Sequence, residues 1–162
     1  MTRRSNKRHQ SGHSDQFARV RTIFFAIMAV VALCGLADAT YLTVAHLSGE
    51  TSLCGSSPGC SIVLSSPYAS LRGIPTAAFG MAGYFAAFSM ATLVAFGYAR
   101  LRPVLGLIVV IMFAATLWFL YVQAFILHAF CPFCLLSAAL TFMLTGLVMA
   151  TPPAHSNLKT TS

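Results

Sequence analysis

The chain has 162 residues, of which 57% are hydrophobic and only 8% are charged. Soluble domains carry about 25% charged residues, so too few polar side chains remain here to cover a water-facing surface. The composition therefore excludes a soluble domain and indicates a protein surrounded by lipid.

Four apolar stretches are each long enough to cross a bilayer core, which takes about 20 residues in a helix. They are Thr22–His46, Ile74–Tyr98, Pro103–His128 and Cys131–Met149. We therefore predict an all-α membrane protein, a four-transmembrane-helix bundle with an outer cysteine loop and a short interfacial half-helix. Residues 22–150 form the membrane domain, between a basic, disordered tail (1–21) and a polar tail (151–162).

The net charge of +7 is a topology signal and argues against nucleic-acid binding. Nine of the ten basic residues fall on one side of a four-span topology, and only Arg72 falls on the other. By the positive-inside rule, both termini are cytoplasmic. The basic residues also attract anionic lipid head groups. We therefore expect a multi-pass protein of the cell (inner) membrane.

The outer loop, about Leu47–Gly73, holds Cys54 and Cys60 with glycine and proline between them. Glycine and proline at that density mark a turn. Residues 61–64 after it are expected to form the interfacial half-helix. A cysteine pair in a loop can take electrons from an outside protein and then approach a second pair.

That second pair, Cys131 and Cys134, opens the fourth span as a CxxC motif on the same outer face. Cys131 is expected near the N-cap, with Pro132 at the first helical position and Cys134 one turn along. The free amides and positive dipole at a helix start stabilise a thiolate. Thiolates are the attacking species in disulfide exchange. The sequence thus predicts two redox stations in series that end at an acceptor dissolved in the membrane, such as a quinone.

Two other interpretations use the same four cysteines. They could form structural disulfides in a non-catalytic membrane subunit or assembly factor, or ligate zinc. The CxxC form disfavours structural disulfides, and an oxidising outer face disfavours zinc, so we expect no metal. Cys34, within the first span, is expected to be an inert apolar residue at a helix contact.

Other residues are candidates for the same chemistry. Asp38 is an ionisable group inside the first span, where it either serves a proton route or bonds a neighbouring helix. Phe133 lies between the two cysteines and is placed to flank a flat ring. His128, three residues before Cys131, either supplies a proton or is an interface residue.

Taken together, these residues resemble the vitamin K epoxide reductase family over about residues 20–150. The resemblance is carried by four spans, the loop cysteines and several short strings. These strings are Cys60-Ser61-Ile62-Val63-Leu64-Ser65-Ser66-Pro67, Gly73-Ile74-Pro75, Cys131-Pro132-Phe133-Cys134, and Asp38 followed by Tyr41-Leu42-Thr43.

The resemblance implies four helices around a quinone (menaquinone or ubiquinone), with the half-helix capping the site. It implies that Cys54 exchanges with a thioredoxin-fold partner, Cys60 relays to Cys131, and Cys134 lies nearest the quinone ring. Ser66 matches a family serine that helps to hold the site. Thr76, beside Pro75, joins Ser66, Phe133 and Asp38 as an expected quinone contact.

Two departures from the animal enzymes that reduce the epoxide favour the bacterial members, which reoxidise a disulfide-forming partner. Ala138 stands where those animal enzymes have a tyrosine, and no asparagine occurs between Asn6 and Asn157. We therefore predict a thiol:quinone oxidoreductase that supports disulfide formation, working with a separate thioredoxin-fold thiol oxidase.

Overall fold

The computed structural model describes residues 3–48 and 58–151, without the side chains of residues 3–18, Pro58 and Leu71. Its four long helices are α1 (Arg3–Ser48), α3 (Thr76–Ala95), α4 (Arg102–Tyr121) and α5 (Pro132–Ala150). Each contains a segment long and apolar enough to cross a membrane. These helices confirm the predicted four-span bundle.

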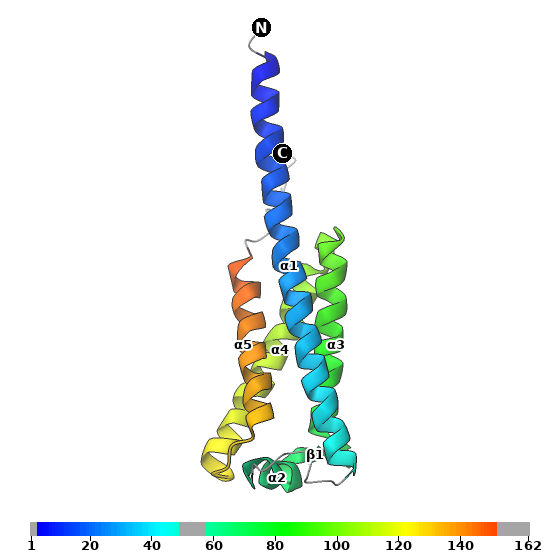
Figure 1. Cartoon of the computed structure of the whole chain (residues 1–162), viewed down its shortest axis with the longest axis vertical. Helices are drawn as coiled ribbons and strands as arrows, with labels where there is room; N and C mark the ends of the chain where they lie inside the picture. The colour runs from blue at the N-terminus through cyan, green and yellow to red at the C-terminus, as the bar shows by residue number, and fades with distance from the viewer. Residues whose placement is uncertain (1–2, 49–57, 152–162) are drawn as a thin grey trace, which may run out of the picture.

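Each helix of the bundle packs on two neighbours. α1 packs most extensively on α3 and also on α5, and α4 packs on α3 and α5 (Figure 1). Small residues allow the close contacts: a Cβ on Gly83 of α3 would lie 3.2 Å from Met112 of α4. Close approach at small residues is typical of membrane helices.

A buried apolar core holds the middle of the bundle together. Tyr84 of α3 is 1% exposed and packs with side chains of α1, α4 and α5. Much of the outer surface is also apolar, and it includes Leu33, Phe85, Leu107, Ile111 and Met149. Because lipid, unlike water, solvates such a surface, this exposure fits an integral membrane protein.

Helix α1 extends well beyond the bundle at its N-terminal end (Figure 1). The sequence predicted a disordered tail over residues 1–21, whereas the structure has helix from Arg3 onward. Residues 3–18 contain no proline, the residue that breaks helices most strongly, so the helix can continue from the span. The C-terminal tail lies outside the described residues from residue 152 onward.

The predicted half-helix is α2 (Pro58–Ser65), which lies across the end of the bundle (Figure 1). The short 3-10 helix η2 (Pro67–Ala69) follows it. Strands β1 (Ser70–Leu71) and β2 (Ile74–Pro75), which were not predicted, then form an antiparallel hairpin. Its two loop residues, Arg72 and Gly73, both have positive φ, as tight two-residue hairpin loops require. The hairpin leads directly into α3.

The third span does not end as a regular helix. The 3-10 helix η3 (Ala99–Leu101) precedes α4, and a π-helical segment, η4 (Val122–Ile126), follows it. Leu127 N–H donates to the Val122 carbonyl five residues earlier, at 2.9 Å. His128 then takes a positive φ of 48°, which is unusual outside glycine. These irregular turns bring the chain back to Cys131 within a short connection.

Candidate active site

Cys131 is the N-cap residue of α5, with Pro132 in the first turn, as the sequence predicts. Its side chain is fully buried, at 0% exposure. Its backbone N–H donates to the side-chain oxygen of Gln123 at 3.1 Å. The reactive-cysteine turn is therefore held by the π-helical segment η4 as well as by its own helix.

The thiol of Cys131 is poised to ionise near neutral pH. A hydrogen bond from the Cys134 thiol is the main cause that lowers the pKa of Cys131, to about 7. The N–H groups of Cys134 and Phe133 at the helix start act in the same direction. Burial and the charge of Asp38 both raise this pKa but do not overcome the hydrogen bonds. Cys131 is thus suited to be the attacking or receiving sulfur in disulfide exchange.

Cys60 lies beside Cys131 at the end of the bundle that α2 crosses. Both are 0% exposed, and they share an apolar cluster with Leu42, Val63 and Ala129. Cys60 is disulfide-bonded, whereas Cys131 and Cys134 are free thiols. Cys54 lies outside the described residues. The described part of the site therefore combines a disulfide-bonded cysteine on α2 with two free cysteines at the start of α5.

A close backbone contact brings these two cysteines together. A Cβ on Gly59 would collide with the carbonyl oxygen of Phe130. Gly59 precedes Cys60, and Phe130 precedes Cys131. Since no side chain separates the two backbones at this point, α2 can lie directly against the start of α5.

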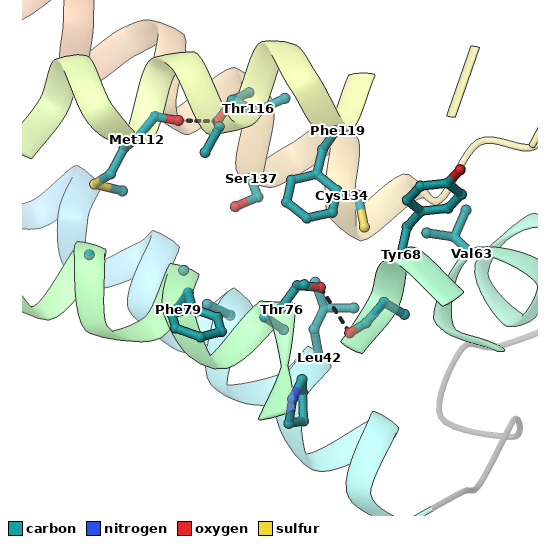
Figure 2. A pocket seen from close by; sticks show the side chains of 18 of the residues that line it. Leu42, Val63, Tyr68, Thr76, Phe79, Met112, Thr116, Phe119, Cys134 and Ser137 are labelled. Atoms are coloured by element: carbon teal, nitrogen blue, oxygen red, sulfur yellow. Dashed lines mark hydrogen bonds between the residues drawn. The ribbon is translucent and has the colours of Figure 1, made fainter. Parts of the chain in front are cut away.

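A cavity of about 500 Å³ opens beside Cys134. In Figure 2 the sulfur of Cys134 points into this space, with the ring of Phe119 next to it. The lining is mostly apolar and comes from all four long helices and from α2 and η2. Such a volume, lined by apolar groups and a few polar ones, is typical of small-molecule sites. The cavity can take a flat apolar ring close to the Cys134 sulfur.

Two residues expected to contact the ligand line this cavity. Ser66 donates its hydroxyl hydrogen to the Val63 carbonyl at 2.7 Å, where α2 turns into η2. Thr76 donates to the Ala69 carbonyl at 2.9 Å and so ties the start of α3 to η2 (Figure 2). Both hydroxyl hydrogens are used within the protein, so these residues shape the wall of the cavity.

The other expected contacts lie next to the cavity and not in its wall. Phe133 packs against Tyr41, with ring centroids 5.1 Å apart. Asp38 is buried at 9% exposure, and its Oδ2 atom has no hydrogen-bond partner. It lies close enough to Cys131 for its charge to act on that thiol.

One remaining expectation, for Cys34, differs from the structure, and the role of His128 stays a prediction. Cys34 is a free, exposed thiol on the outer face of α1, not at a helix contact. His128 is in the connection before Cys131, where its strained backbone is its clearest feature. Within the described ranges no three possible metal-ligating side chains come together.

Sequence reasoning missed Gln123 and a hydroxyl cluster. The hydroxyl of Tyr84 donates to the Ser137 carbonyl at 2.8 Å and contacts the hydroxyls of Ser137 and Thr141, each at 2.9 Å. Tyr84, Ser137 and Gln123 all line the cavity. An isolated glutamine within an apolar span was the available indication for Gln123, since polar groups at membrane depth are costly.

A comparison with protein families finds a match that covers most of the chain. Residues 26–149 match the vitamin K epoxide reductase family. The matched range includes most or all of each of the four spans, and it includes Cys60, Cys131 and Cys134.

Proposed function

The chain belongs to the vitamin K epoxide reductase family and is an integral membrane thiol–disulfide oxidoreductase; on this basis we propose that it reoxidises a thioredoxin-fold partner and passes the electrons to a membrane quinone. The observation that carries the proposal is the arrangement of Cys60 beside Cys131, with Cys134 facing the cavity.

The outer station accepts electrons from the partner. We infer that the disulfide of Cys60 is made with Cys54, because the three other cysteines are free. A partner thiolate attacks the Cys54 sulfur and forms a mixed disulfide, and the second partner thiolate then displaces Cys54. The partner leaves as a disulfide, and Cys54 and Cys60 become thiols. Two electrons have moved inward.

The inner station, Cys131 and Cys134, passes these two electrons to the quinone. The Cys60 thiolate attacks Cys131 of the Cys131–Cys134 disulfide and releases the Cys134 thiolate. Cys54 then attacks Cys60, which restores the outer disulfide and leaves both inner cysteines reduced. This last state has the same pattern of oxidised Cys60 and free Cys131 and Cys134 as the structure. Reforming the inner disulfide delivers two electrons and two protons to the quinone.

The cavity supports a quinone as the acceptor. Its volume of about 500 Å³ suits a substituted ring, and the Cys134 sulfur points into it (Figure 2). When bound, a quinone supplies a two-electron acceptor inside the membrane. Ser66 and Thr76 are proposed to shape its wall, and Phe133 to keep water from the cysteine pair through its packing on Tyr41. Ala138 in the wall leaves room at the ring.

Asp38 is proposed to take up or release a proton during quinone reduction. Quinone reduction needs two protons, and a buried carboxyl with an unpartnered oxygen near Cys131 can take or give one. Its unpartnered state also argues against a purely structural role, because a buried polar atom without a bond destabilises the fold.

The proposed site lies on the outer face of the cell membrane. Arg19, Arg21, Arg100 and Arg102 are at the end of the bundle opposite α2, whereas Arg72 is beside α2. This distribution supports cytoplasmic termini and an extracytoplasmic cysteine site. Disulfides persist in that compartment.

The relay is tested by trapping its mixed disulfide. A variant with Cys34→Ser, Cys54→Ala and Cys134→Ala keeps only Cys60 and Cys131. Its matched control carries Cys131→Ala in place of Cys134→Ala and keeps only Cys60 and Cys134. After mild oxidation, peptide mass spectrometry should find a fast Cys60–Cys131 crosslink and little Cys60–Cys134 crosslink. Equal rates in the two variants would contradict the relay.

A further inference from the structure

Gln123 is a buried amide on the π-helical segment η4. It is 1% exposed and lines the cavity. The backbone carbonyl of Gln123 accepts the N–H of Ala129 at 3.2 Å. This bond ties the backbone of Gln123 to the segment that connects η4 with α5. π turns within helices are frequent at functional sites. Here the π turn places Gln123 between the cysteine turn and the cavity.

The orientation of the Gln123 amide follows from its bond to Cys131. A backbone N–H is only a donor, so the atom that it faces at 3.1 Å must be the amide oxygen, Oε1. The amide nitrogen, Nε2, is therefore directed elsewhere. Among the residues that the structure describes, nothing accepts a hydrogen bond from Nε2.

The Nε2 atom is also open to the cavity. In the described part of the chain, Oδ2 of Asp38 is the only fully buried side-chain oxygen or nitrogen without a partner. Since Nε2 has no partner and is not fully buried, the cavity that Gln123 lines is where it is accessible. A donor that faces an apolar cavity needs an acceptor, which a ligand in the cavity can supply.

Most other polar groups of the cavity wall have already used their hydrogens. The hydroxyls of Ser66, Thr76 and Thr116 donate to backbone carbonyls. Tyr84 and Ser137 bond each other. His46 and Tyr68 are less buried than Gln123, with Tyr68 41% exposed. Gln123 is thus the most deeply buried free donor among the described residues of the wall.

We infer that Gln123 joins the two halves of the site: Oε1 holds the backbone of Cys131, and Nε2 donates a hydrogen bond to a carbonyl oxygen of the quinone. The inference rests on the proposed function. A quinone carbonyl is an acceptor that gains negative charge as electrons arrive, and a preorganised donor stabilises such charge. The same residue therefore positions the sulfur pair and the acceptor relative to each other.

The test uses the full-length protein, oxidised and in detergent, with duroquinone as the probe. This quinone has two equivalent carbonyls and no free ring position for a thiol to attack. In wild type its infrared carbonyl band should split, with one component shifted to lower wavenumber by hydrogen bonding. In Gln123→Leu the split should disappear, and binding should weaken about fivefold to tenfold.

Two controls separate the outcomes. Thr92→Val removes a hydroxyl that bonds the Phe88 carbonyl of its own helix away from the cavity, and it should keep the split band. Tyr68→Phe should also keep the split band. A split that is lost in Tyr68→Phe but kept in Gln123→Leu would assign the donor to Tyr68 and overturn the inference. An unchanged band in Gln123→Leu would overturn it as well. Failure of wild type to bind duroquinone would instead contradict the proposed function together with the inference.

A second measurement does not depend on the stability of Gln123→Leu. Gln10 and Gln16 are the only other glutamines of the chain. In a Gln10→Ala/Gln16→Ala protein labelled with ¹⁵N-glutamine, the Gln123 side-chain amide gives the only glutamine NH₂ signals. Duroquinone should shift them and slow their exchange with water. Signals that stay unchanged while duroquinone is bound would overturn the inference.

Discussion

The backbone of Gly59 packs directly against the carbonyl oxygen of Phe130, with no room for a side chain between them. Because each residue precedes a cysteine of the proposed relay, we expect this contact to influence how closely Cys60 approaches Cys131. The proposed electron path therefore depends on a glycine that carries no chemistry of its own.

Gly59→Ala should slow transfer between the two cysteine stations. The added methyl group must push α2 away from the start of α5, and small displacements of reacting groups can cost up to about 100-fold in rate. The rate of Cys60–Cys131 crosslinking measures the effect. Gly106→Ala is the control, since its Cβ would meet Val148 at an ordinary 3.9 Å. A crosslinking rate equal to that of the control would contradict this role for Gly59.

The pH dependence of Cys131 should reveal its activation. With a pKa of about 7, Cys131 should be almost fully ionised at a pH one to two units above 7. The thiolate should be protonated as the pH falls through 7. Cys134→Ala removes the main stabilising hydrogen bond, so the pKa of Cys131 should rise toward that of a free thiol. Ultraviolet absorbance of the thiolate, with Cys131→Ser as the blank, follows the titration. A midpoint that is the same in wild type and Cys134→Ala would show that Cys134 is not the cause.

Asp38→Asn should lower the pKa of Cys131 further. The negative charge of Asp38 disfavours a second negative charge nearby, so its removal favours the thiolate. The same thiolate titration measures the shift. Thr40→Val, on the exposed face of the same helix, is the control, because its hydroxyl bonds only the Leu36 carbonyl. An unchanged midpoint would mean that Asp38 carries no charge when Cys131 ionises.

Gly35→Ala should destabilise the bundle. A Cβ on Gly35 would collide with the ring of Tyr84, which is 1% exposed and bonded to Ser137 and Thr141. Overpacking of this kind typically costs about 1–3 kcal/mol of unfolding free energy. Thermal unfolding in detergent measures it. Gly146→Ala, with nothing within 4 Å of its Cβ, should leave the midpoint unchanged. Equal midpoints for the two variants would show that Tyr84 moves aside without cost.

Much of this fold follows from local sequence patterns. Apolar length predicted the four spans, and the Cys131-Pro132 pair predicted the start of α5, because proline favours the first turn of a helix. The extent of α1 was not predicted, since the polar composition before residue 19 suggested disorder while its lack of helix breakers permits helix. In this segment the polar composition favours disorder, whereas the lack of helix breakers favours a helix.

The details of the site depend on contacts between distant segments, which one sequence does not show. Whether Gly59 meets Phe130 is decided by how α2 folds across the bundle. The bond from Cys131 to Gln123 depends on the π turn of η4, for which no local residue pattern is distinctive. Ser66 and Thr76 were predicted as site residues, but their use of carbonyls within the protein was visible only in three dimensions.

The measurement that tests the central claim most directly is quinone reduction by the purified protein supplied with a reduced thioredoxin-fold dithiol protein. Wild type is compared with Cys134→Ala, which removes the sulfur that faces the cavity. We predict steady turnover in wild type, with one hydroquinone formed per partner disulfide, and none in the variant. Turnover that persists in Cys134→Ala, or a wild-type protein that oxidises no partner while quinone is present, would contradict the proposed path.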